Sequence, residues 1–71
     1  MARKWLKELR ESKGYTQQRM ADMLGMSRQF YYMVENGKRK PKLDIVLAVK
    51  IGKALNISLK QIYNNERGEQ A

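Results

Sequence analysis

The stretch Gln17–Asn36, QQRMADMLGMSRQFYYMVEN, decides the fold, because its small and apolar positions suit two short helices that cross closely. The spacing predicts a first helix over residues 17–24 and a second helix over residues 28–35. Both helices place their apolar or small side chains on one face, where each can pack against the other. These inward positions are Met20, Ala21, Leu24, Tyr31 and Val34.

Residues that start and stop helices flank this pair. Gly25 falls where the first helix should end, and a residue without a Cβ atom adopts the required positive φ at little cost. Thr16 and Ser27 each precede a helical pattern, so their hydroxyl groups can accept hydrogen bonds from first-turn N–H groups. We therefore expect a capped helix, a sharp turn at Gly25 and a second capped helix.

The rest of the chain also has helical spacing of apolar residues. It predicts a helix over residues 3–13, a largely buried helix over residues 44–55 that includes Ile45, and a short helix over residues 59–63. The polar residues 64–71 are expected to form a disordered tail. The expected fold is all-α, with five helices in a single domain over residues 1–63.

Composition limits the chemistry that this chain can perform. The 71 residues include 15 basic and 7 acidic side chains, for a formal net charge of +8, and contain no Cys or His. Without these residues, disulfides, thiolate zinc sites and the usual general base are excluded, so no enzyme activity, cofactor or metal is expected. The positive charge favours an acidic partner. With no apolar run long enough for a membrane span or a signal peptide, a cytoplasmic protein is expected.

Four segments resemble one known family. The segments are LKELRESKGYTQ, MADMLGMSRQ, VENGKRKP and IGKALNISLKQIY, and their order and spacing resemble the phage-repressor and Cro-like, XRE-type helix-turn-helix regulators of prokaryotes and phages. The resemblance implies a five-helix lambda-repressor-like fold. It also implies sequence-specific binding of double-stranded DNA by a homodimer, with the second helix of the motif in the major groove.

The outward face of that second helix carries the candidate base-reading residues. Arg can donate two hydrogen bonds to guanine, Gln can pair with adenine, and Tyr or Met can contact a thymine methyl group. The alternative is that all of these side chains merely face solvent. The candidates are Arg28, Gln29, Tyr32 and Met33.

Polar and basic residues at the two ends of the motif are candidate phosphate contacts. A Gln at the N-terminus of the first motif helix can reach a phosphate oxygen, as the matching Gln does in the family. The basic segment after the second motif helix can neutralise the flanking backbone, although such a segment can also be solvated surface. The candidates are Gln17, Arg19, Asn36, Lys38, Arg39, Lys40 and Lys42.

Other positions have expected structural roles. Arg10 and Glu35 match positions that pair in the family, so we expect an ion pair between the first and third helices. The hydroxyl of Tyr31 needs water or a partner if its ring is buried. Candidates for a twofold contact are Ile57, Leu59, Ile62 and Tyr63.

The leading hypothesis is a nucleoid-associated repressor that occupies an inverted-repeat operator. With no small-molecule ligand expected, its control would come from its own concentration, an antagonist protein or overlapping operator sites. A second hypothesis is a protein-interaction module, such as an antitoxin or antirepressor, that binds through Phe30, Tyr31, Tyr32 and Met33. A third, a basic amphipathic peptide on an anionic membrane, is disfavoured by Gly25 and the two capped helix starts.

Overall fold

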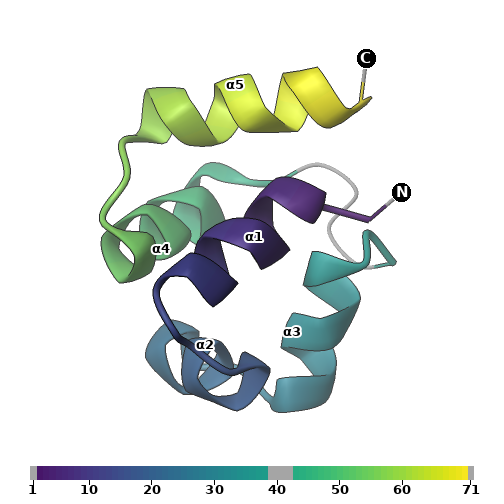
Figure 1. The fold of residues 1–71 in the computed structure, drawn as a ribbon, viewed down its shortest axis with the longest axis vertical. Helices are drawn as coiled ribbons and strands as arrows, with labels where there is room; N and C mark the ends of the chain where they lie inside the picture. Colours follow the sequence, from purple (N-terminus) through teal and green to yellow (C-terminus); the bar gives the residue numbers. More distant parts are fainter. Residues whose placement is uncertain (1, 39–42, 71) are drawn as a thin grey trace.

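The computed structural model describes residues 2–38 and 43–70, which form five α-helices and, within these residues, no strand (Figure 1). The expected all-α, five-helix fold is confirmed. The helices are α1 (Lys4–Ser12), α2 (Gln17–Leu24), α3 (Arg28–Glu35), α4 (Ile45–Leu55) and α5 (Leu59–Gln70).

The helices surround one small core in a molecule of 28 × 24 × 22 Å. The pair α2 and α3 pack against each other, and α2 also contacts α4. Helix α5 lies across α4 and α1, on the opposite side of the molecule from α2 (Figure 1). The start of α1 and the end of α5 lie on the same side of the molecule (Figure 1).

The predicted capping residues and turn of the α2–α3 pair are confirmed. The Thr16 hydroxyl accepts a hydrogen bond from Arg19 N at 3.0 Å, and the Ser27 hydroxyl accepts one from Phe30 N at 3.0 Å. Gly25 ends α2 in the left-handed conformation, with φ 71° and ψ 34°. A residue with a Cβ atom would be strained there, so this glycine sets the angle at which α3 leaves α2.

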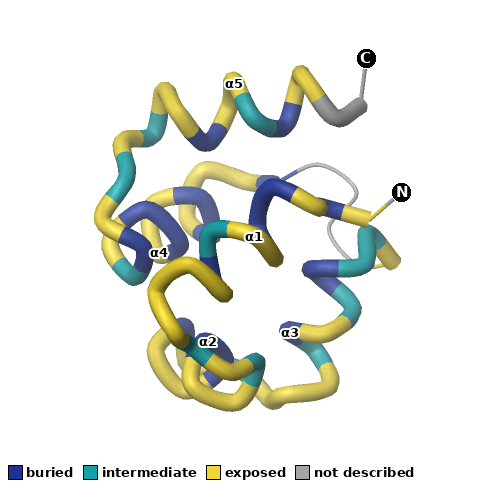
Figure 2. The backbone as a smooth tube through the Cα atoms, viewed as in Figure 1, coloured by how far each residue is buried: buried dark blue, intermediate teal, exposed yellow. Residues whose placement is uncertain are grey.

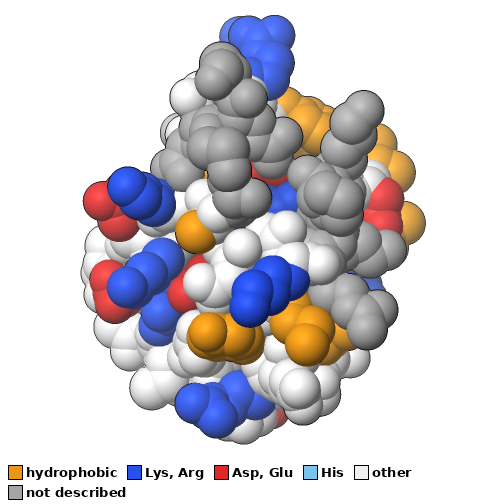
Figure 3. Space-filling model, turned by 90° about the vertical axis from the view of Figure 1, so that its right-hand side faces the viewer, with side chains coloured by type: hydrophobic (Ala, Val, Ile, Leu, Met, Phe, Trp, Pro, Cys, Tyr) orange, Lys and Arg blue, Asp and Glu red, His pale blue; other side chains and the backbone are white. Residues whose placement is uncertain are grey.

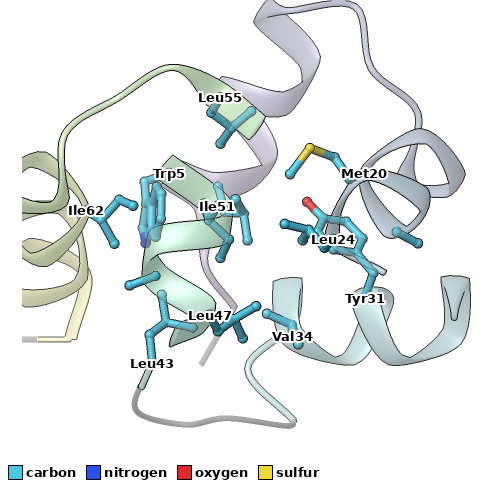
Figure 4. Packing of buried hydrophobic residues seen from close by; sticks show 13 residues of the cluster. Trp5, Met20, Leu24, Tyr31, Val34, Leu43, Leu47, Ile51, Leu55 and Ile62 are labelled. Atoms are coloured by element: carbon cyan, nitrogen blue, oxygen red, sulfur yellow. The ribbon is translucent and has the colours of Figure 1, made fainter. Parts of the chain in front are cut away.

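Helix α4 runs through the centre of the core, but only one of its sides is buried. Figure 4 shows Ile51 and Leu47 between two clusters, with Trp5 and Ile62 on one side and Tyr31 with its neighbours on the other. Burial alternates along the helix (Figure 2). The expectation that Ile45 is buried is wrong: the residue is 59% exposed, because it starts the helix on the side away from α2 and α5.

The expected end of the last helix at residue 63 is wrong, and so is a disordered tail over residues 64–70, because α5 continues to Gln70. Its start is capped reciprocally: the Ser58 hydroxyl accepts from Gln61 N at 3.1 Å, and Gln61 Oε1 accepts from Ser58 N at 2.9 Å. Glu66 lies on the same face as Ile62, one turn further on, and is buried. The buried carboxylate of Glu66, which has hydrogen-bond partners, thus holds the second half of α5 against the domain, where no apolar side chain does so.

Candidate nucleic-acid interface

Helix α3 has one buried and one exposed face. Tyr31 and Val34 are fully buried against the rest of the domain, whereas Arg28, Gln29 and Tyr32 are exposed. Tyr32 is three residues from Gln29 and four from Arg28, and these spacings make it a neighbour of both side chains on the helix surface. Together they line an open hollow on the surface.

The polar ends of this exposed face are available to a partner. Within residues 2–38 and 43–70, no hydrogen bond or ion pair engages the guanidinium of Arg28, the amide of Gln29 or the hydroxyl of Tyr32. Met33 is half-buried and lies at the edge of the same face. The sequence thus correctly predicted which side of α3 faces outward.

Two of the four residues expected for a protein-interaction surface face inward. Tyr31 has no exposed area, and Phe30 is half-buried against the core. Helical geometry separates them from Tyr32, since positions 30 and 31 turn toward α2 while position 32 turns away. The expectation that all four form one binding surface is therefore wrong.

The candidate phosphate contacts divide into two groups. The side chains of Arg19 and Lys38 are exposed, and the guanidinium of Arg19 lies 5.8 Å from the centre of the Tyr15 ring. The amides of Gln17 and Asn36 instead donate within the domain, to Glu35 Oε1 at 3.2 Å and to the Tyr32 carbonyl at 2.8 Å. Arg39, Lys40 and Lys42 lie outside the described residues.

The side of the molecule that carries α3 combines charge with apolar surface. In Figure 3, which shows this side, Lys and Arg side chains lie beside exposed hydrophobic ones, and acidic side chains gather toward the edges. Base edges and thymine methyl groups require this mixture of donors and apolar contacts.

The predicted ion pair of Arg10 and Glu35 is confirmed and belongs to a larger network. Arg10 Nε donates to Glu35 Oε2 at 2.9 Å, and Arg10 Nη2 donates to Oε1 at 3.3 Å. The Tyr31 hydroxyl donates to Glu35 Oε2 at 2.7 Å, which gives this buried phenol its partner. Together with the amide of Gln17, these contacts fix the C-terminal end of α3 against α1 and the start of α2.

The network changes the acidity of its members. Burial raises the pKa of Glu35, but hydrogen bonds from Arg10, Tyr31 and Gln17 outweigh burial and hold that pKa below its ordinary value. Burial, followed by the hydrogen bond to Glu35, raises the pKa of Tyr31 far above its ordinary 10.0. Glu35 is therefore ionised and Tyr31 neutral at neutral pH.

A second buried network was not predicted. Arg3 Nε donates to both carboxylate oxygens of Glu66, at 3.0 and 2.9 Å, and Trp5 Nε1 donates to Oε2 at 2.8 Å. Arg3 Nη1 donates to the Val34 carbonyl at 2.6 Å. The end of α3 is thus tied to both ends of the chain. One cue was available in the sequence, because Leu59, Ile62 and Glu66 fall on one helical face.

The positions proposed for a twofold contact are only partly accessible. Ile62 is fully buried in the core, so its prediction as a dimer contact is wrong; it faces α4 because Gly52 lets α5 approach closely. Ile57 and Leu59 are half-buried, and Tyr63 is 39% exposed. On α4, Val46 and Val49 are also exposed, by 63% and 40%.

Two further features of the described residues concern other kinds of site. They contain no group of three or more His, Cys, Asp or Glu side chains that could hold a metal ion. Among the helices of residues 2–38 and 43–70, none has the length and apolar character needed to cross a membrane.

Comparison with known proteins identifies the family. A helix-turn-helix family model matches residues 6–62, which include all of α2, α3 and α4. The chain therefore belongs to the XRE-type helix-turn-helix family of DNA-binding transcriptional regulators.

Several relatives come from Bacillus subtilis (strain 168). The uncharacterized HTH-type transcriptional regulator YqaF is 46% identical over 55 residues, which cover 78% of this chain and 70% of YqaF. The SPbeta prophage-derived uncharacterized HTH-type transcriptional regulator YonR is 49% identical over 53 residues, covering 75% of this chain and 47% of YonR. The uncharacterized HTH-type transcriptional regulator YqaE is 38% identical over 65 residues, covering 92% of this chain and 54% of YqaE.

The matched region thus makes up about half of the length of YonR and YqaE. No solved structure gives a significant match to the chain.

Proposed function

We propose that this chain is a cytoplasmic, nucleoid-associated repressor that binds an inverted-repeat operator as a homodimer, with α3 of each copy in the major groove. Two such helices would read half-sites about 34 to 36 Å apart, one turn of the duplex. Bound there, the dimer blocks access of polymerase to the promoter. Family membership supports the DNA-binding part of the proposal.

The observation that carries the proposal is that Arg28 and Gln29 point outward with their polar groups unoccupied by any part of the chain that the structure describes. Both side chains are exposed in the first turn of α3, and neither is engaged within the described residues. Arg28 can donate two hydrogen bonds to guanine O6 and N7, and Gln29 can pair with adenine N6 and N7. Tyr32 and Met33, one turn further on, can contact thymine methyl groups.

Phosphate contacts would orient α3 in the groove. Arg19 and Lys38 offer exposed cations near the two ends of the motif, and Arg39, Lys40 and Lys42 extend the basic segment after α3. Gln17 and Asn36 each have a second amide hydrogen and can donate it to a phosphate while they keep their contacts inside the domain. These contacts set position and affinity, whereas α3 sets sequence preference.

A selection of binding sites from random duplex DNA tests the proposal. The expected result is an inverted repeat with a fixed half-site spacing. Arg28→Ala should then weaken binding to the selected site by about 1 to 3 kcal/mol and relax the choice of base there. The matched control is Lys60→Ala, which removes an equal charge from an exposed position on α5.

The two variants separate base reading from general electrostatics. Lys60→Ala should leave base preference unchanged. An Arg28→Ala variant that loses affinity equally for selected and random duplexes would show that Arg28 contacts phosphate. A selection that yields no preferred sequence would refute sequence-specific binding by this chain.

A further inference from the structure

A buried arginine near the start of the chain holds the end of α3. The Arg3 side chain is only 2% exposed, and its Nη1 donates to the Val34 carbonyl at 2.6 Å. Its backbone N donates to the Glu35 carbonyl at 2.7 Å. The last carbonyl groups of a helix have no partner inside that helix, and the helix dipole favours a cation beside them. Arg3 thus caps the C-terminal end of α3 from outside the motif.

Helix α3 receives this cation from another part of the chain, since its own last turn contains no basic residue. On α5, the Glu66 carboxylate in turn holds the guanidinium of Arg3, accepting from Nε at 3.0 and 2.9 Å. Figure 1 shows the start of α1 between the end of α3 and the second half of α5. Arg3 therefore connects the end of α3 to α5.

The value of a buried ion pair at this place lies in its geometry. Such a pair loses in desolvation about as much as it gains from attraction, and apolar residues of similar volume often give an equally stable core. The guanidinium group, however, binds its partners in a fixed planar arrangement. For Arg3 these partners are a carboxylate on α5 and the backbone of α3. The contact therefore fixes the position of α3 against the rest of the domain.

We infer that Arg3 is a positioning residue for DNA readout, because it fixes the direction of α3. The inference rests on the proposed function, since it concerns how α3 lies in the groove. The turn at Gly25 and the Ser27 cap hold the N-terminal end of α3. At the other end, the side chain of Glu35 is one attachment, and a helix can turn about a single attachment. The bonds from Arg3 to the Val34 and Glu35 carbonyls prevent that turn.

The expected effect of losing the Arg3 side chain depends on position along α3. The eight residues of this helix make it about 12 Å long. If its C-terminal end is released while Gly25 holds the other end, the residues near the released end shift most. Tyr32 and Met33 lie nearer to that end than Arg28 does. Preference should therefore weaken at the bases that Tyr32 and Met33 contact and change little at the base that Arg28 reads.

Two variants that differ only at Arg3 test the inference. Glu66→Gln removes the carboxylate but leaves Arg3 in contact with the Val34 carbonyl. The double substitution Arg3→Met with Glu66→Gln removes that contact as well, and the new amide oxygen can still accept the bond from Trp5 Nε1. No charge is then buried at this place. The double variant should therefore be at least as stable toward urea as Glu66→Gln.

Sequence preference should follow the opposite order. It is measured as the ratio of the affinities for the selected site and for a random duplex. Glu66→Gln should retain most of this ratio, whereas the double variant should lose about tenfold, within the range that one lost base contact costs. With a purely structural role, preference would follow stability, and the double variant would be no worse than Glu66→Gln. That result would overturn the inference.

Arg3→Lys keeps a cation beside Glu66, so it tests the inference even if the double variant does not fold. A single ammonium group cannot reproduce the planar fork, and preference should fall at the bases that Tyr32 and Met33 contact. Gln61→Ala destabilises α5 at its start and should keep the wild-type preference. Wild-type preference in Arg3→Lys, or the altered preference in Gln61→Ala, would overturn the inference.

A measurement without DNA separates this inference from the proposed function. Residual dipolar couplings of backbone amides report the orientation of α3 relative to α4. This orientation should change in the double variant and stay as in the wild type in Glu66→Gln. If the wild type prefers no duplex, the proposed function fails, and the couplings still test the role of Arg3. If the wild type selects a sequence but the couplings of the double variant match those of the wild type, the inference alone is wrong.

Discussion

Two buried ion pairs hold the C-terminal end of α3, and they differ in the sequence distance that each one bridges. Arg10 and Glu35 are 25 residues apart and join α1 to the motif itself. Arg3 and Glu66 are 63 residues apart and join the two ends of the chain. The two networks meet at α3, where Arg3 N donates to the Glu35 carbonyl and Arg3 Nη1 to the Val34 carbonyl.

The difference shows how the same interaction can do two tasks in so small a domain. The Arg10–Glu35 pair fixes the helices that present Arg28 and Gln29, and its carboxylate receives donors on both oxygens. The Arg3–Glu66 pair holds the second half of α5 against the core, where the helix has no buried apolar residue after Ile62. Loss of the first should disturb the whole domain, and loss of the second should mainly release α5.

Glu35→Gln should have the largest effect and break the network at its centre. In Gln, an NH2 group replaces one carboxylate oxygen, so it would face the N–H or O–H groups that now donate hydrogen bonds to that oxygen. Arg10 would stay buried without its counter-charge. The free energy of unfolding should fall by about 3 to 5 kcal/mol, as measured by urea denaturation. A loss below 1 kcal/mol would mean that the pair contributes little to the fold.

The pH dependence of stability supplies a control for this variant. Because the pKa of Glu35 is lowered by folding, its contribution is present above the ordinary value of 4.5 and is lost as the pH falls through the folded-state pKa. Glu35→Gln should therefore flatten the acid side of the stability profile. An acid side as steep as that of the wild type would assign the dependence to other carboxyl groups.

Glu66→Gln should lower the free energy of unfolding by less than Glu35→Gln, which sharpens the contrast between the two pairs. Arg3 Nε and Trp5 Nε1 both approach Oε2, so the single oxygen of Gln can replace it while the amide nitrogen turns away. Arg3 keeps the Val34 carbonyl as an acceptor, just as Arg10 keeps the Tyr15 carbonyl, so the smaller loss follows from the shared Oε2, whereas the donors to Glu35 are divided between both of its oxygens. We expect a loss of about 1 to 3 kcal/mol, with the rest of the fold intact.

Hydrogen exchange can show which helix is released. Amide protection in Glu66→Gln should fall first in the second half of α5, and protection of α2 and α3 should stay near the wild-type level. Gln61→Ala, which removes the side-chain half of the reciprocal cap at the start of α5, is a control that destabilises the same helix from its other end. Equal loss of protection in α2 and α3 would show that both ion pairs serve the same cooperative unit.

The contrast also explains which features the sequence could predict. The boundaries of α2 and α3, the caps at Thr16 and Ser27 and the turn at Gly25 depend on neighbouring residues, so local rules suffice. The Arg10–Glu35 pair came from resemblance to the family. The Arg3–Glu66 pair depends on the tertiary docking of α5, and nothing near Glu66 in the sequence identifies its partner.

For helix α4, the sequence could not predict which apolar residues would be exposed. Its apolar residues occur on every side, so periodicity alone could not tell the buried Leu47 and Ile51 from the exposed Ile45 and Val46. For the candidate DNA interface, the outward direction of Arg28 and Gln29 followed from the helical period. The hydrogen bond from Gln17 to Glu35 could not be predicted from the helical period, because it depends on how α3 packs against the start of α2.

Tyr31→Phe should have the smallest effect and test how many donors the Glu35 carboxylate needs. The ring stays buried, and Glu35 Oε2 keeps Arg10 Nε at 2.9 Å, so no buried group loses its last partner. We expect a loss of about 1 kcal/mol at neutral pH, for one hydrogen bond removed without a cavity.

The pH dependence of stability above pH 10.0 tests whether folding raises the pKa of the Tyr31 phenol. Burial raises the pKa of Tyr31 above its ordinary 10.0, so the phenol ionises in the unfolded chain before it ionises in the folded one. Its contribution is complete below pH 10.0 and is lost as the pH rises from there toward the folded-state pKa. The variant keeps the other three of the four tyrosines, so the difference between the two alkaline profiles isolates Tyr31. Parallel profiles above pH 10.0 would mean that its hydroxyl ionises as easily in the folded domain as in the unfolded chain, and that the Glu35 network rests on Arg10 and Gln17 alone.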